Sequence, residues 1–492
     1  MLVAACAASP PPPAMPPTAP PSASSAPVAT AAVAPALAPL PEHLGEWIDA
    51  YASALGREWG ETRAFSGYLL VAREGVPVFG KAYGKANRAT GALAGADTRF
   101  RIGSITKQFT AVAILQLAEK GLVRVEDPLS KYLPGLPFGD RITLHHCLSH
   151  TSGIANMTED EALMKDHAKP HTREQVVAVF ASKPLAFEPG AEFRYSNSNY
   201  FLLGMVVEKV TGLSYEDYLQ RSVLGPAGMT RTSTVDAPDA PDTAAGYTDD
   251  DGTLAPAHAV DMSIPFAAGA LRSTSNDLVR WDRALAGDAL LTADSKRRMV
   301  TPVREHYGYG VATKTVAGRE VEEHGGGIDG FSSDLARVPA EHLVVVALSN
   351  EDSFRPEAMV AAIVEMAVTG SKIDPPTETA VVPFDAATLA RFPGSYAIDP
   401  ASDEAYRGKL PGAVMAAIQT IAVTGEQGRL RFKPNGQGEV GVFLRADGAL
   451  FTKGGGISLE PEQAKGVVAS FVLKQGGLAL RYVRAAGAVK KR

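Results

Sequence analysis

Ser104 and Lys107 lie three residues apart in RIGSITKQFTAVAILQLAEKG, the stretch that spans residues 101–121. On a helix, side chains at this spacing share one face. One interpretation is a serine N-cap followed by an exposed lysine that covers the first turn. The other is a nucleophile beside its base, because a serine hydroxyl attacks a carbonyl only when a neighbouring group removes its proton. Ser104 is the only serine of the chain with a lysine three residues later, but about one such pair is expected by chance.

A lysine can act as that base only in its neutral form, which requires burial or a neighbouring cation or dipole to lower its pKa. Four apolar side chains predict burial of this segment: Ile105, Phe109, Val112 and Leu115. The N-terminal end of a helix also disfavours an ammonium in its first turn. The sequence therefore predicts a buried helix that begins at Ser104 and ends at Gly121.

Two further motifs contain groups that can assist this pair. Tyr195-Ser196-Asn197, in FRYSNSNY, is the only Tyr-x-Asn of the chain, and His324 precedes three glycines in EEHGGGIDGFSSDLARVP. Alone, the first is typical of a loop that caps a helix, and the second of a tight turn. Together, a phenol and a carboxamide can relay the proton and hold the lysine. A glycine-rich edge strand can donate an N–H to an oxyanion beside the N–H of Ser104, which indicates an acyl-transfer site.

Other chemically active residues carry less weight. We interpret His150, in LSHTSGI, as a structural turn histidine, because turn-forming residues surround it. Cys147 has three histidines nearby, but Leu144 and Leu148 favour a buried small residue over a metal ligand. Asp329 either gates the entrance of the site or caps a turn. The absence of a G-x-S-x-G motif excludes the α/β-hydrolase route to a serine enzyme.

The composition places the chain among globular proteins of more than one domain, with 492 residues, 45% of them hydrophobic and 21% charged. A net charge of -6 gives no reason to expect nucleic acid or an anionic membrane surface as a partner. The two cysteines, Cys6 and Cys147, support neither a disulfide framework nor a zinc site. We expect no metal and no organic cofactor. No run of about 18 apolar residues predicts a membrane-spanning helix.

The N-terminal region combines MLVAAC with a Pro/Ala/Ser-rich tether that cannot bury a core. Val3-Ala4-Ala5-Cys6 resembles a bacterial lipobox, in which Cys6 would be lipidated, although no basic region is present and the apolar part is short. Either the true start lies upstream of Met1 or the match is accidental. We favour the first interpretation, and expect an exported bacterial protein that is periplasmic or membrane-anchored as a lipoprotein.

The order of patterns predicts four segments. Residues 1–41 are a signal remnant and tether, residues 42–370 a main domain, residues 371–384 a linker and residues 385–492 a small all-β, barrel-like domain. Within the main domain, a β-hairpin turns at Glu74-Gly75, helices follow, and period-two strands appear after residue 307. The fold class is therefore α/β (α+β), an antiparallel sheet flanked by helices with a helical subdomain.

The motifs also occur in a familiar order and spacing. FRIGSITKQFTAVAILQLAEKGLVRVEDPLSKYLP, LSHTSGI, FEPGAEFRYSNSNYFLLGMVVEKVTG and HGGGIDGFSS together resemble the serine β-lactamase and penicillin-binding-protein superfamily, in its class C-like branch. That branch holds class C β-lactamases, D-alanyl-D-alanine carboxypeptidases, D-aminopeptidases and serine esterases. The resemblance covers roughly residues 42–370 and implies a β-lactamase/transpeptidase-like fold.

The resemblance implies a role for each motif residue. Ser104 is the acylated nucleophile, Lys107 its partner, and Tyr195 a general base or proton relay. Asn197 orients the lysine and the substrate. The place of the family's K-T-G element is taken by His324, Gly325 and Gly326, and Gly327 offers the second oxyanion N–H. Whether Lys107 or Tyr195 takes the proton stays open, because strongly coupled groups titrate as a pair.

One departure from the family bears on the substrate. The K-T-G lysine binds the substrate carboxylate in most relatives, whereas His324 is mostly uncharged near neutral pH at an ordinary pKa. Loss of a charge-assisted hydrogen bond costs about 1.5–3 kcal/mol. This favours ester or D-amino-acid-type peptide substrates, with acylation of Ser104 and deacylation by water. The alternatives are a β-lactamase or penicillin-binding DD-carboxypeptidase, a non-turnover protein that binds peptidoglycan or β-lactams, and a scaffold with a vestigial pocket. The expected partner is a small ester, peptide or lactam, and peptidoglycan is a further candidate.

Overall fold

The computed structural model describes residues 37–57, 65–234, 240, 242–250, 253–375 and 381–485, except for 408–414, 416–417, 427–428, 435–439, 446–447, 453–456, 465 and 476–477. Cys6 and almost all of the tether lie outside the described residues. Within the described ranges, no helix is long and apolar enough to cross a membrane.

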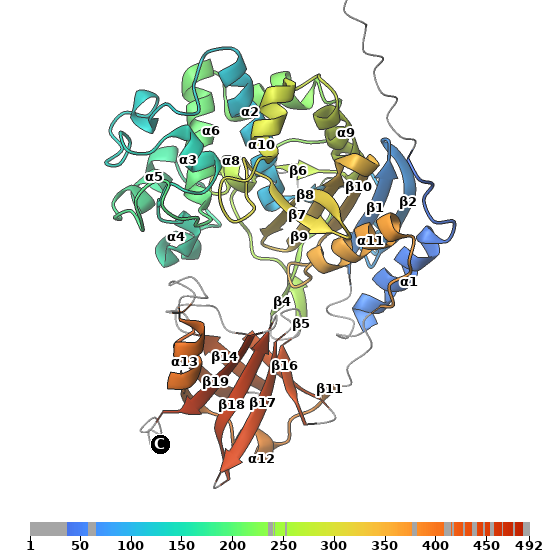
Figure 1. Cartoon of the computed structure of the whole chain (residues 1–492), viewed down its shortest axis with the longest axis vertical. Helices are drawn as coiled ribbons and strands as arrows, with labels where there is room; N and C mark the ends of the chain where they lie inside the picture. The colour runs from blue at the N-terminus through green and yellow to red at the C-terminus, as the bar shows by residue number, and fades with distance from the viewer. Residues whose placement is uncertain are drawn as a thin grey trace, which may run out of the picture. The chain divides into compact units, whose positions relative to one another are not determined.

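A six-stranded antiparallel sheet forms the centre of the first part of the chain, in the order β2-β1-β10-β9-β8-β7 among the described residues (Figure 1). The strands are β1 (Gly67–Arg73), β2 (Val76–Tyr83), β7 (Ala312–Val316), β8 (Arg319–Ile328), β9 (Phe331–Val338) and β10 (Leu343–Ser349). The predicted hairpin between β1 and β2 is present, and Glu74 and Gly75 both have positive φ, as a two-residue turn requires.

Helices cover both faces of this sheet, so its central strands are buried on both sides. On one face, α11 (Glu357–Thr369) packs against β9 and β10, and α1 (Leu44–Arg57) packs against α11 (Figure 1). On the other, α9 (Ser275–Ala286) packs against β1 and β10. Neighbouring residues of β1 accordingly enter different hydrophobic cores: Leu69 joins the core under α1 and α11, and Leu70 joins the core on the opposite face of the sheet.

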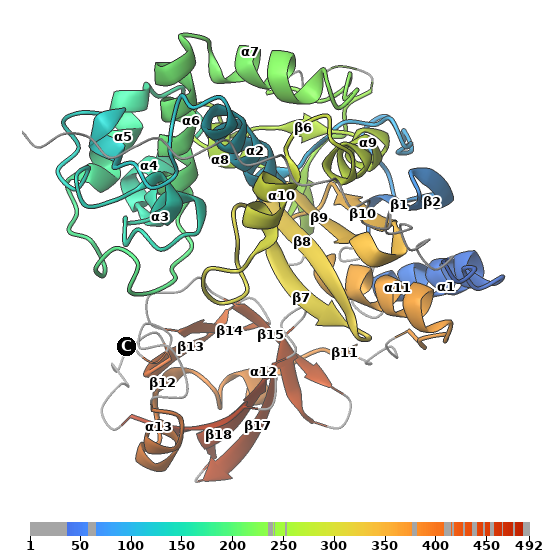
Figure 2. The same ribbon diagram turned by 45° about the horizontal axis from the view of Figure 1, so that its top comes forward.

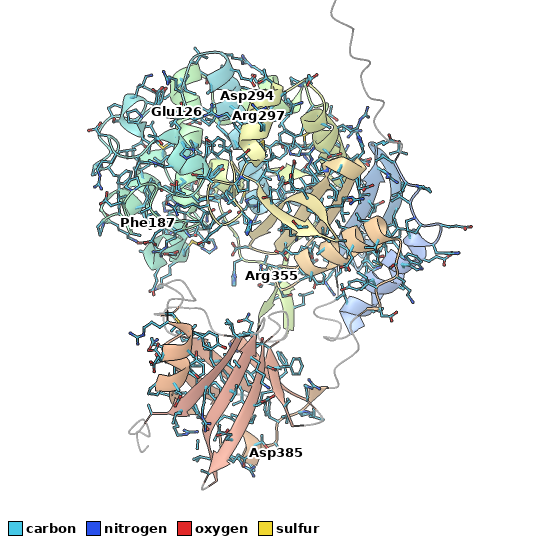
Figure 3. The ribbon with its side chains drawn as sticks, viewed as in Figure 1. Glu126, Phe187, Asp294, Arg297, Arg355 and Asp385 are labelled. Carbon is cyan, nitrogen blue, oxygen red and sulfur yellow. The ribbon has the colours of Figure 1, made fainter. Side chains whose placement is uncertain are left out.

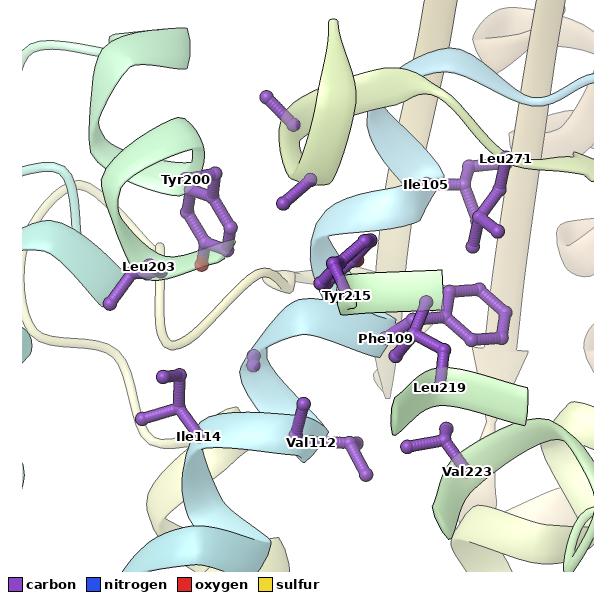
Figure 4. Close-up of a cluster of buried hydrophobic side chains, with 14 of the residues drawn as sticks. Ile105, Phe109, Val112, Ile114, Tyr200, Leu203, Tyr215, Leu219, Val223 and Leu271 are labelled. Carbon is purple, nitrogen blue, oxygen red and sulfur yellow. The ribbon is translucent and has the colours of Figure 1, made fainter. Parts of the chain in front are cut away.

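Helix α2 (Thr106–Glu119) runs through the second core, preceded by the 3-10 turn η2 (Gly103–Ile105). Every residue from Thr106 to Leu117 is buried, and the helix reaches the surface only at its last residues. Figure 4 shows Phe109, Val112 and Ile114 of this helix within a cluster of buried hydrophobic side chains. Phe109 stacks on Trp281 with ring centroids 4.0 Å apart. The predicted buried helix is confirmed, but Ser104 does not cap it, since Ile102 and Ile105 stand at the cap positions and make no side-chain cap hydrogen bond.

A second region, made mainly of helices, lies beside α2 (Figure 2). Its members include α3 (Leu144–Leu148), α4 (Glu161–Lys165), α5 (Arg173–Ala181), α6 (Asn197–Thr211), α7 (Tyr215–Leu219) and α8 (Phe266–Gly269). Helices α6 and α8 both contact α2 and each other. Helix α10 (Ala293–Val300) packs on α2, and the short pairs β3 (Phe100–Arg101) with β6 (Arg272–Ser273) and β4 (Tyr247–Asp250) with β5 (Thr253–Pro256) complete this part.

The C-terminal part is a closed antiparallel barrel. Among the described residues, consecutive strands from β12 to β19 pair in sequence, and β19 pairs back with β12. The strands are β12 (Gly394–Ile398), β13 (Thr420–Glu426), β14 (Arg429–Pro434), β15 (Val440–Arg445), β16 (Leu450–Thr452), β17 (Ser458–Ala464), β18 (Val467–Gln475) and β19 (Leu478–Arg484). Two short helices, α12 (Ala386–Leu389) and α13 (Pro400–Tyr406), accompany them. The barrel-like all-β prediction is confirmed, and β11 (Val381–Val382), from the predicted linker, joins the sheet beside β15.

Strand β8 approaches the loop before α2 at its glycines. A Cβ atom on Gly326 would lie 2.0 Å from the carbonyl oxygen of Ile102, whereas one on Gly327 would meet only Arg355, at 3.9 Å. A Cβ on Gly103 would lie 2.9 Å from the Gly327 nitrogen, and Gly103 has a φ of +48°. The sheet and η2 are therefore close enough that only glycine fits at Gly103 and Gly326.

We expect Gly326→Ala to lower the free energy of unfolding by about 1–3 kcal/mol, because the methyl group overlaps a backbone oxygen. The matched variant Gly327→Ala should stay within about 0.5 kcal/mol of wild type, because the added methyl meets open space. Urea denaturation at pH 7 measures both values. Equal destabilisation by the two variants would contradict the close approach of β8 to Ile102.

Candidate active site

Lys107 lies at the centre of the site and is fully buried. Its Nζ donates hydrogen bonds to Asn197 Oδ1 at 2.8 Å and to the Ala268 carbonyl oxygen at 2.8 Å. These use both N–H groups of a neutral amine, and its lone pair is left for the Ser104 hydroxyl, whose Oγ lies 2.9 Å away. Burial holds the pKa of this amine well below its usual value. In the described part of the chain, none of its hydrogen-bond acceptors is a carboxylate. The interpretation of an exposed lysine behind a serine cap is therefore excluded.

Tyr195 lies beside the serine–lysine pair. Its ring centroid is 4.8 Å from Lys107 Nζ, and its phenol is near enough to the Ser104 side chain to influence its own pKa. Burial raises the pKa of this phenol, so it remains protonated at neutral pH. Desolvation thus shifts the two groups in opposite senses, toward a neutral amine and a neutral phenol, both in reach of one hydroxyl.

Asn197 joins the serine–lysine pair to the helical region. It is the first residue of α6, and its backbone N–H donates to Asn156 Oδ1 at 3.0 Å. Its Oδ1 accepts from Lys107, and its Nδ2 donates to Thr158 Oγ1 at 3.2 Å. Both ends of the carboxamide are occupied, so its orientation is fixed.

The glycines of β8 border the site beside Ser104. Strand β7 pairs with β8 only as far as Glu323, so the edge of β8 is free of β7 from His324 onward. The close approach of Gly103 to the Gly327 nitrogen brings this free edge beside Ser104. The backbone N–H groups of Ser104 and Gly327 can therefore act together on one oxyanion.

His324 is buried, and both of its ring nitrogens form hydrogen bonds within the protein rather than facing a substrate. Its Nδ1 donates to the carbonyl oxygen of Gly325 at 2.6 Å, and its Nε2 accepts from the Tyr307 hydroxyl at 2.8 Å. Burial, together with the nearby Lys107, lowers the pKa of the imidazole to about 4. Where the resemblance leads us to expect a lysine, this chain has a neutral ring that hydrogen bonds with a carbonyl of the open strand edge.

A pocket of about 240 Å³ adjoins Ser104 and is bordered by Asn197 and Gly327. Its apolar wall is formed by Met157, Met164, Val260, Ile264 and Pro265. Asp329 and His167 also line it, with Asp329 Oδ1 3.4 Å from His167 Nε2. The geometry fits a moderately sized, mainly apolar substituent next to the reactive carbonyl.

The structure thus brings together Ser104, Lys107, Tyr195, Asn197 and the glycines, and places His324 behind them. Sequence reasoning missed the Ala268 carbonyl, Thr158 and Tyr307, which belong to no motif. Cys147 is buried, with its pKa raised by desolvation, in agreement with a packing role. No cluster of histidine, cysteine and acidic residues that could hold a metal occurs within the residues described.

Comparison with known proteins finds similar proteins that agree with one another in family and fold. The Beta-lactamase family model matches residues 48–368. Penicillin-binding protein 4* of Bacillus subtilis is 27% identical over 444 residues, which cover 85% of this chain and 94% of the relative. The crystal structure of a D-stereospecific amidohydrolase from Streptomyces is 30% identical, with a TM-score of 0.57, and the match covers 66% of this chain and 99% of that one. A penicillin-binding protein homologue from Pyrococcus abyssi, 24% identical with a TM-score of 0.58 over 84% of this chain and 95% of that one, shares the fold.

The buried imidazole predicts a pH dependence of stability. Because the pKa of His324 falls from 6.5 to about 4 on folding, the unfolded chain takes up the proton first as the pH drops. Stability from this group is complete above pH about 6.5 and declines toward pH about 4. His324→Asn keeps a donor near the position of Nδ1 but cannot titrate. Denaturation at pH 7 and 4.5 should therefore show a decline smaller by roughly 2 kcal/mol in the variant. Parallel declines would contradict the burial of a neutral ring.

Proposed function

The chain belongs to the β-lactamase family and is a serine hydrolase. We propose that an ester or a D-amino-acid-type amide acylates Ser104, and that water then hydrolyses the acyl-enzyme. One observation carries the proposal: a desolvated amine within hydrogen-bond distance of a single serine hydroxyl. Packing alone does not require a serine, a lysine, a tyrosine and an asparagine to converge on that point.

In the acylation step, Ser104 Oγ bonds to the substrate carbonyl carbon while its proton passes to the neutral amine of Lys107. The carbonyl oxygen takes up the negative charge and accepts N–H groups from Ser104 and Gly327. The opposite pKa shifts of Lys107 and Tyr195 favour the amine as the base and the phenol as a proton relay. The bond to the leaving group then breaks, and the proton is delivered to that group through Tyr195.

In the deacylation step, a water molecule attacks the acyl carbon from the same site. Its proton passes to the Lys107–Tyr195 pair, the bond from Ser104 Oγ to carbon breaks, and the serine recovers a proton. Asn197 keeps the amine in place throughout, because its Oδ1 is held by Lys107 and its Nδ2 by Thr158.

The neutral His324 supports substrates that need no carboxylate anchor at this position. The apolar wall of the adjoining pocket supports an apolar substituent on the substrate. The relatives include a D-stereospecific amidohydrolase and a penicillin-binding protein, which agrees with amides of D-amino acids as the substrate class.

A second candidate, a carboxypeptidase that requires a free carboxylate, is favoured by Arg355. This exposed residue lies just before α11, with Nη1 3.9 Å from the position of a Cβ on Gly327 (Figure 3). In the described chain, no carboxylate forms an ion pair with it. Its guanidinium can therefore supply the positive charge that His324 lacks.

Export and anchoring remain proposals of their own. The lipobox-like Val3-Ala4-Ala5-Cys6 and the Pro-rich tether support a lipoprotein held near the peptidoglycan, and the lipobox-like residues lie outside the described residues. We also keep the boundaries of the four predicted segments as proposals.

We expect wild-type protein to hydrolyse at least one of four probes: p-nitrophenyl butyrate, D-phenylalanine amide, a D-Ala-D-Ala peptide or a chromogenic cephalosporin. Ser104→Ala and Lys107→Met should each lose about 10³-fold or more in kcat/KM, since one removes the nucleophile and the other its base. The control Lys131→Met changes an exposed lysine and should keep full activity. Mass spectrometry detects the acyl-enzyme. A stable adduct without turnover would select a non-turnover binding protein, and inactivity on every probe would defeat the proposal.

Arg355→Ala separates the two candidate substrate classes. If a substrate carboxylate binds there, KM for the D-Ala-D-Ala peptide should rise by about 10-fold or more, while KM for its C-terminal amide stays unchanged. Arg355→Lys retains the charge and should recover part of the affinity. An equal effect of Arg355→Ala on the acid and the amide would argue against the carboxypeptidase.

A further inference from the structure

His150 lies directly behind the proposed proton relay. It follows α3 in the turn predicted from LSHTSGI, is fully buried and has a φ of +56°. A left-handed backbone is uncommon for residues other than glycine, although histidine is among those that adopt it more often. The contacts of His150 show what this backbone position achieves.

Two of these contacts are with the residues directly before and after Tyr195 in the sequence. The backbone N–H of Arg194 donates to the carbonyl oxygen of His150 at 2.9 Å. The backbone N–H of Ser196 donates to its Nδ1 at 3.2 Å. Between these two hydrogen bonds, the imidazole lies against the ring of Tyr195, with centroids 4.2 Å apart and planes 33° from parallel. One histidine thus fixes the residue before Tyr195, the residue after it and its ring.

The hydrogen bonds also identify the tautomer. Nδ1 accepts the Ser196 N–H and lies 3.2 Å from Asn199 Nδ2, so it carries no proton. The neutral ring then has its proton on Nε2, which is buried and finds no hydrogen-bond partner in the described part of the chain. Tyr200 and Tyr307 surround the ring, with centroids 5.2 Å and 5.0 Å away. Burial lowers the pKa of this imidazole well below its usual value, so the ring is neutral near pH 7.

We propose that His150, in its neutral Nε2–H form, is a positioning residue that sets the Tyr195 hydroxyl and the Asn197 carboxamide around the Lys107 amine. The inference rests on the proposed function, because it assigns His150 an effect on the acylation of Ser104. It touches neither substrate nor the reacting atoms, and acts only through Tyr195 and the Ser196 backbone that leads into α6. A tyrosine displaced by an ångström loses proton-transfer efficiency by up to about 10²-fold.

The chemistry of the position explains why a histidine is present. It needs an acceptor two bonds from Cβ for the Ser196 N–H, a flat face for Tyr195 and tolerance of positive φ. Asparagine provides the acceptor and tolerates the backbone but lacks the face. Phenylalanine provides the face but leaves the buried Ser196 N–H unpaired, which costs about 1–3 kcal/mol.

The test compares His150→Asn, His150→Phe and the control His146→Asn, which changes a half-buried histidine of the same segment outside the site. Single-turnover acylation is measured on whichever probe the wild type turns over. His150→Phe should slow acylation by about 10- to 100-fold with little change in KM, His150→Asn by less, and His146→Asn not at all. Thermal unfolding confirms that the compared samples are folded.

A double-mutant cycle with Tyr195→Phe tests whether His150 acts through the tyrosine. If it does, adding His150→Phe to Tyr195→Phe slows acylation by less than about threefold, because the hydroxyl that the histidine positions is already gone. Full additivity would overturn the proposal, as would unchanged acylation in folded His150→Phe. If His150→Phe does not fold, the same cycle is run with His150→Asn.

A readout independent of activity keeps the inference separate from the proposed function. Nitrogen-15 NMR of labelled protein at pH 7 should show the His150 imidazole neutral, with its proton on Nε2. Assignment follows from the signal lost in His150→Asn. A protonated ring or the Nδ1–H tautomer would overturn the proposal even in an active enzyme. Inactivity of the wild type with the expected tautomer would instead defeat the proposed function and leave His150 as a structural clamp.

Discussion

The structure depends on a buried amine that has neutral partners. Placing an ammonium in a protein interior costs several kcal/mol unless a counter-charge balances it, and the described chain supplies Lys107 with a hydroxyl, an amide oxygen and a backbone carbonyl instead. Each partner of the amine comes from a different element: η2, α6 and α8. The buried part of α2, from Thr106 to Leu117, keeps the amine from reaching solvent, so the packing of the helical region also maintains the neutral state of the amine.

Much of this arrangement could be predicted from the sequence, because the reacting side chains lie in compact motifs. Burial of α2 followed from its apolar residues, and the position of Tyr195 and Asn197 beside Lys107 followed from the family resemblance. The Ala268 carbonyl could not be found, because every residue has a carbonyl and only the fold selects one. Tyr307 lies 17 residues before His324, and no local pattern joins the two. The contacts of His150 could not be predicted from composition either, because Arg194 and Ser196 lie far from it in the sequence.

In β8, His324 stands where the family resemblance leads us to expect a lysine, and the histidine has a different role there. Because β7 stops pairing at Glu323, the following edge of β8 exposes both donors and acceptors. A catalytic edge needs free N–H groups, but a free carbonyl beside them would repel a developing oxyanion. The hydrogen bond from His324 Nδ1 to the Gly325 carbonyl removes that acceptor from the edge. The histidine thus contributes to the electrostatics of the site from behind the strand, in place of a cation that faces the substrate.

The apolar wall of the pocket beside Ser104 shares its segments with the groups that hold Asn197 and Lys107. Met157 lies between Asn156 and Thr158, which both hydrogen bond with Asn197. Ile264 and Pro265 lead into α8, whose Ala268 carbonyl accepts from Lys107. A change in the size of a wall side chain is therefore coupled to the position of the amine, and a directed-evolution library restricted to the wall would alter turnover together with the choice of acyl group.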